Sequence, residues 1–220
     1  MRYRAFIFDV GDILFDVTVW RKWLTGYLRG LGVEIDYPTL VTQWEAALQP
    51  VYVGRKEYWE AFTEMLASLG LDDQQIEAAI VAARVKAHSP AVTTRRLFDG
   101  VAETLADLKR MGCKLAVLSD TESSGQKIRS QLADLGIADH FDAVLTSHDL
   151  GHTKPSPHAF EAALAALGVA KDEAAFVAHD EDELAGAMAY GITAVAFNFA
   201  PPVPADHYIW HFPELIRLAQ

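Results

Sequence analysis

Short apolar runs that alternate with helical patterns constrain the fold of this chain more than any other feature. From about residue 97 onward, such runs are followed by segments whose apolar residues recur every three or four positions. Runs of this kind are typical of strands buried on both faces of a sheet, with the helices covering those faces. The runs predict strands at residues 114–119, 141–147, 174–178 and 192–199, and a short one near 208–210. The expected fold is therefore α/β, with a doubly wound, parallel, Rossmann-like sheet.

The N-terminal part of the chain has a different pattern. Residues 4–10 form one more apolar run, which ends at Gly11. Residues 17–88 then contain four helical patterns and no convincing strand. We therefore expect a helical cap, residues 16–96, inserted after the first strand, and an α/β core made of residues 1–15 and 97–220.

Composition and charge limit the partners of the chain. Its 220 residues, 51% of them hydrophobic, are enough for one α/β core and a modest second unit. The formal net charge of −11 disfavours binding to nucleic acid or to an anionic membrane. The single cysteine, Cys113, excludes an internal disulfide and fits a reducing cytoplasm. No signal-peptide pattern or membrane-spanning run is found, so we expect a cytoplasmic protein. Its expected oligomeric state is a monomer or a homodimer.

Polar side chains follow the predicted strands at their carboxyl ends. In open parallel sheets, ligands bind beyond these ends, so the side chains are expected to converge on one edge. They are Asp9, Ser119, Asp120, Lys154, His179 and Asp180.

The residue types at this edge suit phosphoryl transfer. The carboxylate of Asp9 can attack an electrophilic centre and form a covalent ester or acyl phosphate. Asp9 and Asp180 together offer the oxygen ligands that Mg²⁺ prefers. Ser119 can donate a hydrogen bond to a transferring oxygen, and Lys154 can neutralise charge on the phosphoryl group. Asp120, next to Ser119, joins these two as an expected substrate-binding residue.

Four segments of the chain resemble the signature segments of one enzyme family. In sequence order they are FIFDVGDILFD, LAVLSDT, KPSPHAF and FVAHDEDELAGA. They are similar to those of the haloacid dehalogenase-like hydrolases, and the helical insert resembles the helical cap of that family. The resemblance implies Asp9 as the nucleophile, Ser119 and Lys154 as phosphate-site residues, Mg²⁺ as cofactor and, most often, phosphatase activity on a small phosphorylated molecule.

The first segment departs from the pattern of the family's phosphatases. They usually carry a second aspartate two places after the nucleophile, which acts as general acid and base, and here this place is Gly11. The carbonyl of Gly11 can still bind a metal but cannot protonate a leaving group. Asp12 is the candidate replacement, although a role in the turn is equally expected of it. Because acid–base help is worth about 10²–10⁴-fold, ordinary phosphate esters are expected to react slowly.

The fourth segment also departs, because Ala178, His179 and Asp180 stand where the family usually has Gly-Asp. Asp180 is the favoured metal ligand, with a role as N-cap of the next helix as the alternative. If His179 takes the position of the aspartate, metal binding should weaken. Glu183 is a candidate for orienting Lys154 or a metal-bound water.

The cap sequence gives weaker indications of substrate-binding residues than the core does. VYVGRKEY places a glycine before two cations, so Arg55 is predicted to bind substrate, with Arg21, Tyr52 and Tyr58 as further residues that face the site. The tryptophans of the cap are expected to pack between its helices.

Three functions are consistent with these residues. The first is a Mg²⁺-dependent phosphatase that acts through an aspartyl phosphate. The second is a 2-haloacid dehalogenase, although the tyrosine usual in those enzymes is absent at Gly11. The third is a binding or regulatory protein that has lost catalysis, as the changed first and fourth segments would allow.

Overall fold

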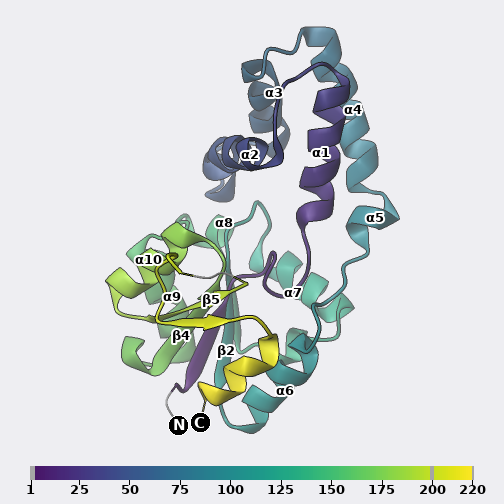
Figure 1. Cartoon of the computed structure of the whole chain (residues 1–220). Helices are drawn as coiled ribbons and strands as arrows, with labels where there is room; N and C mark the ends of the chain where they lie inside the picture. Colours follow the sequence, from purple (N-terminus) through teal and green to yellow (C-terminus); the bar gives the residue numbers. More distant parts are fainter. Residues whose placement is uncertain (1–2, 199–200, 220) are drawn as a thin grey trace.

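A six-stranded, all-parallel sheet forms the centre of the computed structural model, which describes residues 3–198 and 201–219 (Figure 1). The strand order is β3-β2-β1-β4-β5-β6. Their bounds are β1 Ala5–Phe8, β2 Lys114–Ser119, β3 Ala143–Thr146, β4 Ala174–Ala178, β5 Thr193–Phe197 and β6 His207–Ile209. The predicted doubly wound parallel sheet is confirmed. Since the chain moves from β1 outward to β3 and then returns to β4, the point where the order reverses lies beside β1.

Both faces of the sheet are covered by helices. Helices α6 (Val101–Arg110), α7 (Gly125–Asp134) and η3 (Phe212–Arg217) pack on one face, and α9 (Pro157–Leu167) and α10 (Glu181–Tyr190) pack on the other. The remaining short helices of the core are η1 Ala138–His140, α8 Ser147–Leu150 and η2 Lys171–Glu173.

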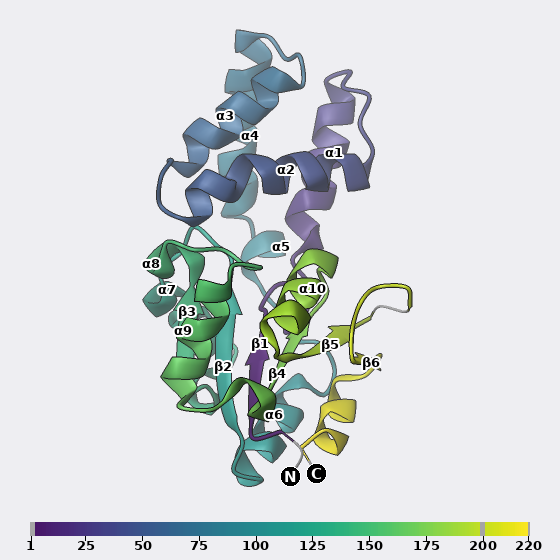
Figure 2. The same ribbon diagram turned by 90° about the vertical axis from the view of Figure 1, so that its left-hand side faces the viewer.

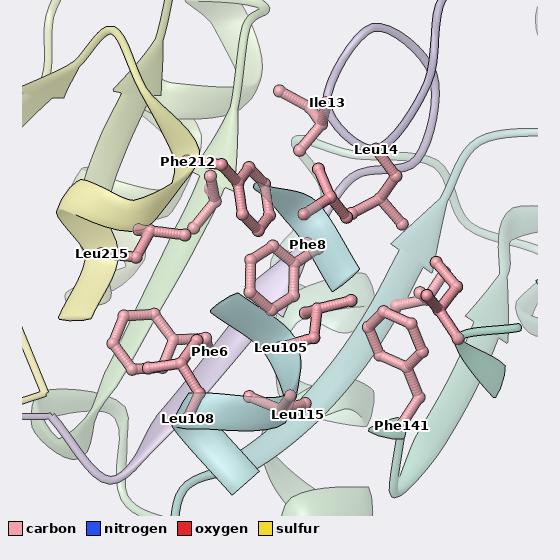
Figure 3. Packing of buried hydrophobic residues seen from close by; sticks show 14 of the residues in the cluster. Phe6, Phe8, Ile13, Leu14, Leu105, Leu108, Leu115, Phe141, Phe212 and Leu215 are labelled. Atoms are coloured by element: carbon pink, nitrogen blue, oxygen red, sulfur yellow. The ribbon is translucent and has the colours of Figure 1, made fainter. Parts of the chain in front are cut away.

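The central position of β1 in the sheet explains why every residue of this strand is apolar. Phe6 and Phe8 are buried against the α6 side, where Phe8 stacks on Phe212 with the ring centroids 5.7 Å apart (Figure 3). Ala5 and Ile7 are buried against the α9 and α10 side. Successive side chains of a strand point to opposite faces, so a strand covered on both faces is apolar at every position.

The cap is a helical unit above the sheet (Figures 1 and 2). Its helices are α1 Thr18–Gly30, α2 Tyr37–Tyr52, α3 Tyr58–Ser68, α4 Asp73–Ala87 and the short α5 Pro90–Thr93. It has its own hydrophobic core, in which Trp44 contacts Tyr58 and Phe62 edge to face. The four predicted helices are present, and the expected packing of tryptophans between them is confirmed.

The cap is joined to the core by two segments that lie side by side. Phe15 and Leu97 form an antiparallel bridge, and the amide of Phe98 donates to the carbonyl of Leu14 at 3.0 Å. The predicted boundaries, 15/16 and 96/97, fall within these two segments. As a division into domains they stay a prediction.

Several strands are shorter than predicted. The run at 141–147 gives a strand only up to Thr146, because the hydroxyl of Thr146 caps α8 by accepting from the amide of Asp149. The run at 192–199 leaves the strand at Asn198, whose φ is +58°, and its last residue, Phe199, lies outside the described residues. Among the described residues, no helix is both long and apolar enough to cross a membrane.

Candidate active site

A cavity of about 1030 Å³ lies between the carboxyl ends of the strands and the cap. We call its core side the core rim, which consists of Asp9, Ser119, Asp120, Lys154, His179 and Asp180. We call its cap side the cap wall, which consists of Trp20, Arg21, Trp44, Glu45, Tyr52, Tyr58 and Trp59. The six strand-end residues named from the sequence therefore line one cavity.

Asp9 follows β1 directly, at the centre of the sheet. Its backbone amide donates to the carbonyl of Val177 in β4 at 3.0 Å, which continues the strand pairing as far as Asp9. Its side chain is 15% exposed and its Oδ1 accepts a 2.7 Å hydrogen bond from the ammonium of Lys154. Asp9 is thus held by strand pairing of its backbone and by a buried cation.

Lys154 uses its ammonium fully within the protein. Its side chain is completely buried, and Nζ donates to Asp9 Oδ1 and to the carbonyl of Leu118 at 3.0 Å, with Glu183 Oε1 at 3.2 Å. Burial alone would lower the pKa of Lys154, but the carboxylates of Asp9 and Glu183 outweigh it and raise the pKa above its ordinary range. Because an ammonium has three donors, direct contact with substrate would require one of these interactions to break.

Glu183 lies in α10 and its carboxylate pairs with the ammonium of Lys154, while its orienting role stays a prediction. Burial raises the pKa of Glu183 well above its usual range, although the neighbouring ammonium opposes this. Within the described part of the chain, its Oε2 is a buried atom without a hydrogen-bond partner.

Asp120 anchors the loop that carries Lys154. Both of its carboxylate oxygens accept from the backbone amide of Lys154, at 3.0 and 3.2 Å. Burial raises the pKa of Asp120 to about 6, while Lys154 acts in the opposite direction. Ser119 is 7% exposed at the end of β2. The substrate contacts predicted for Ser119 and Asp120 stay predictions.

Asp12, three residues after Asp9, is bonded to groups of the cap and of the segment that leads into it. Asp12 adopts a left-handed φ of +56°, its Oδ1 accepts from the amide of Val17 at 3.0 Å, and its Oδ2 pairs with Arg21 at 2.8 Å. It is not among the residues that line the cavity, whereas Gly11 is. The expected turn role is therefore present, and the catalytic role of Asp12 stays a prediction.

His179 and Asp180 have different neighbours in the structure. Asp180 is the N-cap of α10, where its Oδ1 accepts from the amide of Glu183 at 3.1 Å. His179 Nε2 lies 4.0 Å from Asp9 Oδ2. In residues 3–198 and 201–219, no three His, Cys, Asp or Glu side chains are grouped so that they could hold a metal ion. The metal set predicted as Asp9, Gly11 and Asp180 stays a prediction, and its alternative, the N-cap, is what Asp180 forms here.

The cap wall contains an ionic group that the sequence did not reveal. Tyr52 donates to Glu45 Oε2 at 3.0 Å, and Arg21 lies 3.9 Å from Glu45 Oε1. Burial raises the pKa of Glu45, and the tyrosine hydrogen bond partly offsets this. Glu45 is the single acid of α2, but its local sequence does not indicate that it faces the cavity.

Arg55 does not line this cavity. Helix α2 continues to Tyr52, and the amide of Arg55 donates to the carbonyl of Pro50 at 2.8 Å in the turn that closes the helix. The Arg55 side chain is exposed. Arg21 and Arg95 are the arginines that line the cavity, and the substrate-binding role of Arg55 stays a prediction.

Comparison with known proteins gives consistent results. A family model for haloacid dehalogenase-like hydrolases matches residues 3–191. The chain is 27% identical over 198 residues to a glyceraldehyde 3-phosphate phosphatase of Methanothermobacter thermautotrophicus, covering 89% of this chain and 85% of the relative. It is 25% identical over 169 residues to the pyrophosphatase PpaX of Halalkalibacterium halodurans, covering 74% and 75%.

A solved structure described as a dehalogenase is similar over nearly the whole length. It is 25% identical and superposes with a TM-score of 0.68, covering 98% of this chain and 96% of the other. Since the family model spans the first, second, third and fourth signature segments, the resemblance seen in the sequence is confirmed. The chain belongs to the haloacid dehalogenase-like hydrolases.

Proposed function

We propose that this hydrolase is a phosphatase for a small phosphorylated molecule, with Asp9 as its covalent nucleophile. The observation that carries this proposal is the pairing of Asp9 with the fully buried ammonium of Lys154 at the base of the cavity. The hydrogen bond from Lys154 holds one carboxylate oxygen of Asp9 in place at the end of β1, and a positioned carboxylate is what nucleophilic attack requires. Relatives named as phosphatases support the substrate class.

The reaction divides into two displacements at phosphorus. The Asp9 carboxylate forms a bond to phosphorus, the bond to the leaving oxygen breaks, and that oxygen takes a proton from water. Water then attacks phosphorus and gives a proton to the hydroxide left by the first step, the bond to Asp9 breaks, and inorganic phosphate is released. Lys154 stabilises the negative charge of the Asp9 carboxylate before the first displacement and again when the second displacement releases it.

The cavity offers two groups that could bind a divalent cation. Asp9 Oδ2 is not engaged by Lys154, and Gly11 lines the same cavity with only its backbone available as a ligand. Such an ion would neutralise charge on the transferring phosphoryl group. Mg²⁺ is the ion predicted from the sequence. The cytoplasmic location and the monomeric or homodimeric state are further predictions of this kind.

The missing acid at Gly11 limits the leaving groups. An Asp at this place would put its Cβ 3.1 Å from Val17 Cγ2, so Val17 would have to move. Gly11 itself has no side chain that could protonate the leaving oxygen. We expect aryl phosphates, whose leaving groups need no proton, to react faster than alkyl phosphates.

The first test is hydrolysis of p-nitrophenyl phosphate by wild type and Asp9→Asn, without metal and with Mg²⁺ or Mn²⁺. We expect turnover by the wild type only, together with a wild-type species heavier by one phosphoryl group after rapid quenching. Equal turnover by Asp9→Asn would exclude the proposal. Absence of turnover under every condition would shift support to the second candidate.

The second candidate is hydrolysis of a carbon–halogen bond. Gly11 favours it, because a halide leaves with its electron pair and needs no acid. Asp9 would attack the carbon, and water would then cleave the resulting ester at the carboxyl carbon of Asp9, giving a 2-hydroxy acid, a halide and a proton. Chloride release from 2-chloropropionate that depends on Asp9 but not on a metal would support it.

A further inference from the structure

Aromatic rings make up much of the cap wall. The ring centroids of Trp20 and Trp44 are 6.0 Å apart, and those of Trp44 and Tyr58 are 5.9 Å apart. The planes of each pair are inclined by 66°, so the three rings do not form one flat stack. All three line the cavity. Rings arranged in this way suit an organic cation, because the face of each ring attracts positive charge.

An aromatic ring of the cap wall already contacts a cation of the protein. The guanidinium carbon of Arg84 lies 4.7 Å from the centroid of the Trp59 ring. Arg84 does not line the cavity, whereas Trp59 does. The remaining rings, those of Trp20, Trp44 and Tyr58, are therefore the ones that a cation inside the cavity would meet.

One carboxylate lies among these rings. Glu45 lines the same cavity, and its side chain is 44% exposed. Its Oε2 accepts from Tyr52, while the nearest cation, Arg21, is 3.9 Å from its Oε1. Arg21 is bonded more closely to Asp12, at 2.8 Å, and the charge of Asp12 offsets it. The cap wall therefore keeps the negative charge of Glu45.

Glu45 and Asp9 lie within reach of each other's charge. Burial raises the pKa of Glu45, and the carboxylates of Asp180 and Asp9 raise it further. Because Coulomb interactions weaken with distance, one small substrate can have its phosphoryl group at Asp9 and its other end at Glu45. A cation bound there would favour the ionised form of Glu45.

The charges of the cavity disfavour a substrate with a second anionic group. Among the described residues that line it, eight are Asp or Glu and three are Lys or Arg. Lys154 and Arg21 already pair with carboxylates, which leaves Arg95 for any further anion. A leaving group with a positive charge meets less repulsion in such a cavity than a neutral or anionic one.

We propose that the substrate is the phosphate ester of a short amino alcohol, whose ammonium group is bound by the carboxylate of Glu45 and the aromatic rings of the cap wall. The inference rests on the proposed function, because it places the phosphoryl group at Asp9. It adds the chemical class of the leaving group. Cation–aromatic contacts are strongest where the cation is removed from water, as inside a cavity.

The test compares two esters that differ in the charge of the leaving group. Phosphocholine carries a quaternary ammonium group, and 3,3-dimethylbutyl phosphate has a carbon atom in place of the nitrogen. Titration calorimetry in the presence of Mg²⁺ measures their binding to the full chain with Asp9→Asn, which prevents turnover. We expect phosphocholine to bind about tenfold more tightly or better.

Two further substitutions assign the preference to the cap wall. Glu45→Gln and Trp20→Leu, each added to Asp9→Asn, should lower the ratio of the two affinities by about fivefold or more. Glu64→Gln is the control and should leave the ratio unchanged, because Glu64 is an exposed acid of α3 outside the cavity. Thermal unfolding checks that each variant is folded.

The outcomes separate this inference from the proposed function. Equal binding of the two esters, no binding of either, or a ratio unchanged in Glu45→Gln or in Trp20→Leu overturns the inference. Tighter binding of 3-phosphoglycerate than of phosphocholine also overturns it and assigns Arg95 to a carboxylate. Preference for phosphocholine in a chain whose wild type hydrolyses no phosphate ester would uphold the cation site and refute the phosphatase proposal.

Discussion

The core rim and the cap wall line one cavity, but they are constructed differently. The core rim holds Asp9 at a strand end and fixes it through the fully buried Lys154. The cap wall presents side chains from helix faces, and Glu45, for example, is 44% exposed and held by one hydrogen bond from Tyr52. The rim is thus fixed by strand pairing and buried bonds, whereas the wall depends on how the cap helices pack.

This difference predicts that the core rim and the cap wall affect different kinetic constants. Groups that must hold a reacting atom need rigid support, which strand ends and buried ion pairs provide. Groups that select a substrate can lie on a separate unit that meets the core through two linking segments. Substitutions in the core rim should therefore reduce the rate constant, while those in the cap wall should change substrate affinity.

Asp9→Asn should have the largest effect. Asparagine keeps the shape and an acceptor for Lys154 but cannot form a stable ester, so kcat should fall by at least about 10³-fold. Steady-state kinetics on p-nitrophenyl phosphate measure this, with urea unfolding as the control for folding. A loss of less than tenfold would mean that the core rim does not supply the nucleophile.

Lys154→Met should follow, with an effect on both rate and stability. It leaves Asp9 and Glu183 without a cation in a buried setting, so the free energy of unfolding should fall by about 3–5 kcal/mol and kcat by about 10²-fold. The double variant Lys154→Met/Glu183→Gln should regain part of the stability but not the rate. Recovery of both would contradict a direct role of the ammonium beside Asp9.

Restoring an acid at residue 11 should increase the rate on poor leaving groups. Gly11 does not have a positive φ, so its backbone accepts a side chain, and Val17→Ala creates the space that its Cβ needs. Relative to Val17→Ala alone, Gly11→Asp/Val17→Ala should hydrolyse an alkyl phosphate about tenfold faster, with less change for an aryl phosphate. An equal gain on both substrates would refute the role of a missing acid.

Glu45→Gln should have a smaller effect, on substrate affinity. It removes a negative charge from the cap wall and keeps an acceptor for Tyr52, so KM for p-nitrophenyl phosphate should fall about threefold at unchanged kcat. Glu64→Gln is the matched control, because Glu64 is an exposed acid of α3 outside the cavity. An equal change in both variants would show that only the overall charge matters.

The smallest expected effect is a pH dependence of stability at Asp120. Its pKa in the folded protein is about 6, above the unfolded value of about 3.9, so folding takes up a proton between these two values. The wild type therefore loses stability through this group as the pH rises from about 4 to 6. Because Asp120→Asn cannot ionise, its stability relative to wild type should rise over this interval, by on the order of 1 kcal/mol, in parallel urea titrations. A flat difference would contradict the raised pKa.

The sequence by itself determined the parallel sheet, the helical insert and the edge at which the polar residues meet. Apolar runs and helical periodicity are local signals, and burial on both faces makes each strand apolar, as Phe6 and Ile7 in β1 show. Asp9 and Lys154 could be named for the same reason, since each follows a recognisable strand end or motif.

Only the tertiary structure decided which partner each remaining polar group takes. Asp12 pairs with Arg21 from the cap, Asp180 caps its own helix, and His179 faces Asp9. Each of these side chains has several possible hydrogen-bond partners of similar strength. The partner it takes depends on a difference of one residue in position or on the packing of a separate helical unit. The spacing of residues in the sequence does not predict these partners, because they depend on how the cap and α10 pack against the sheet.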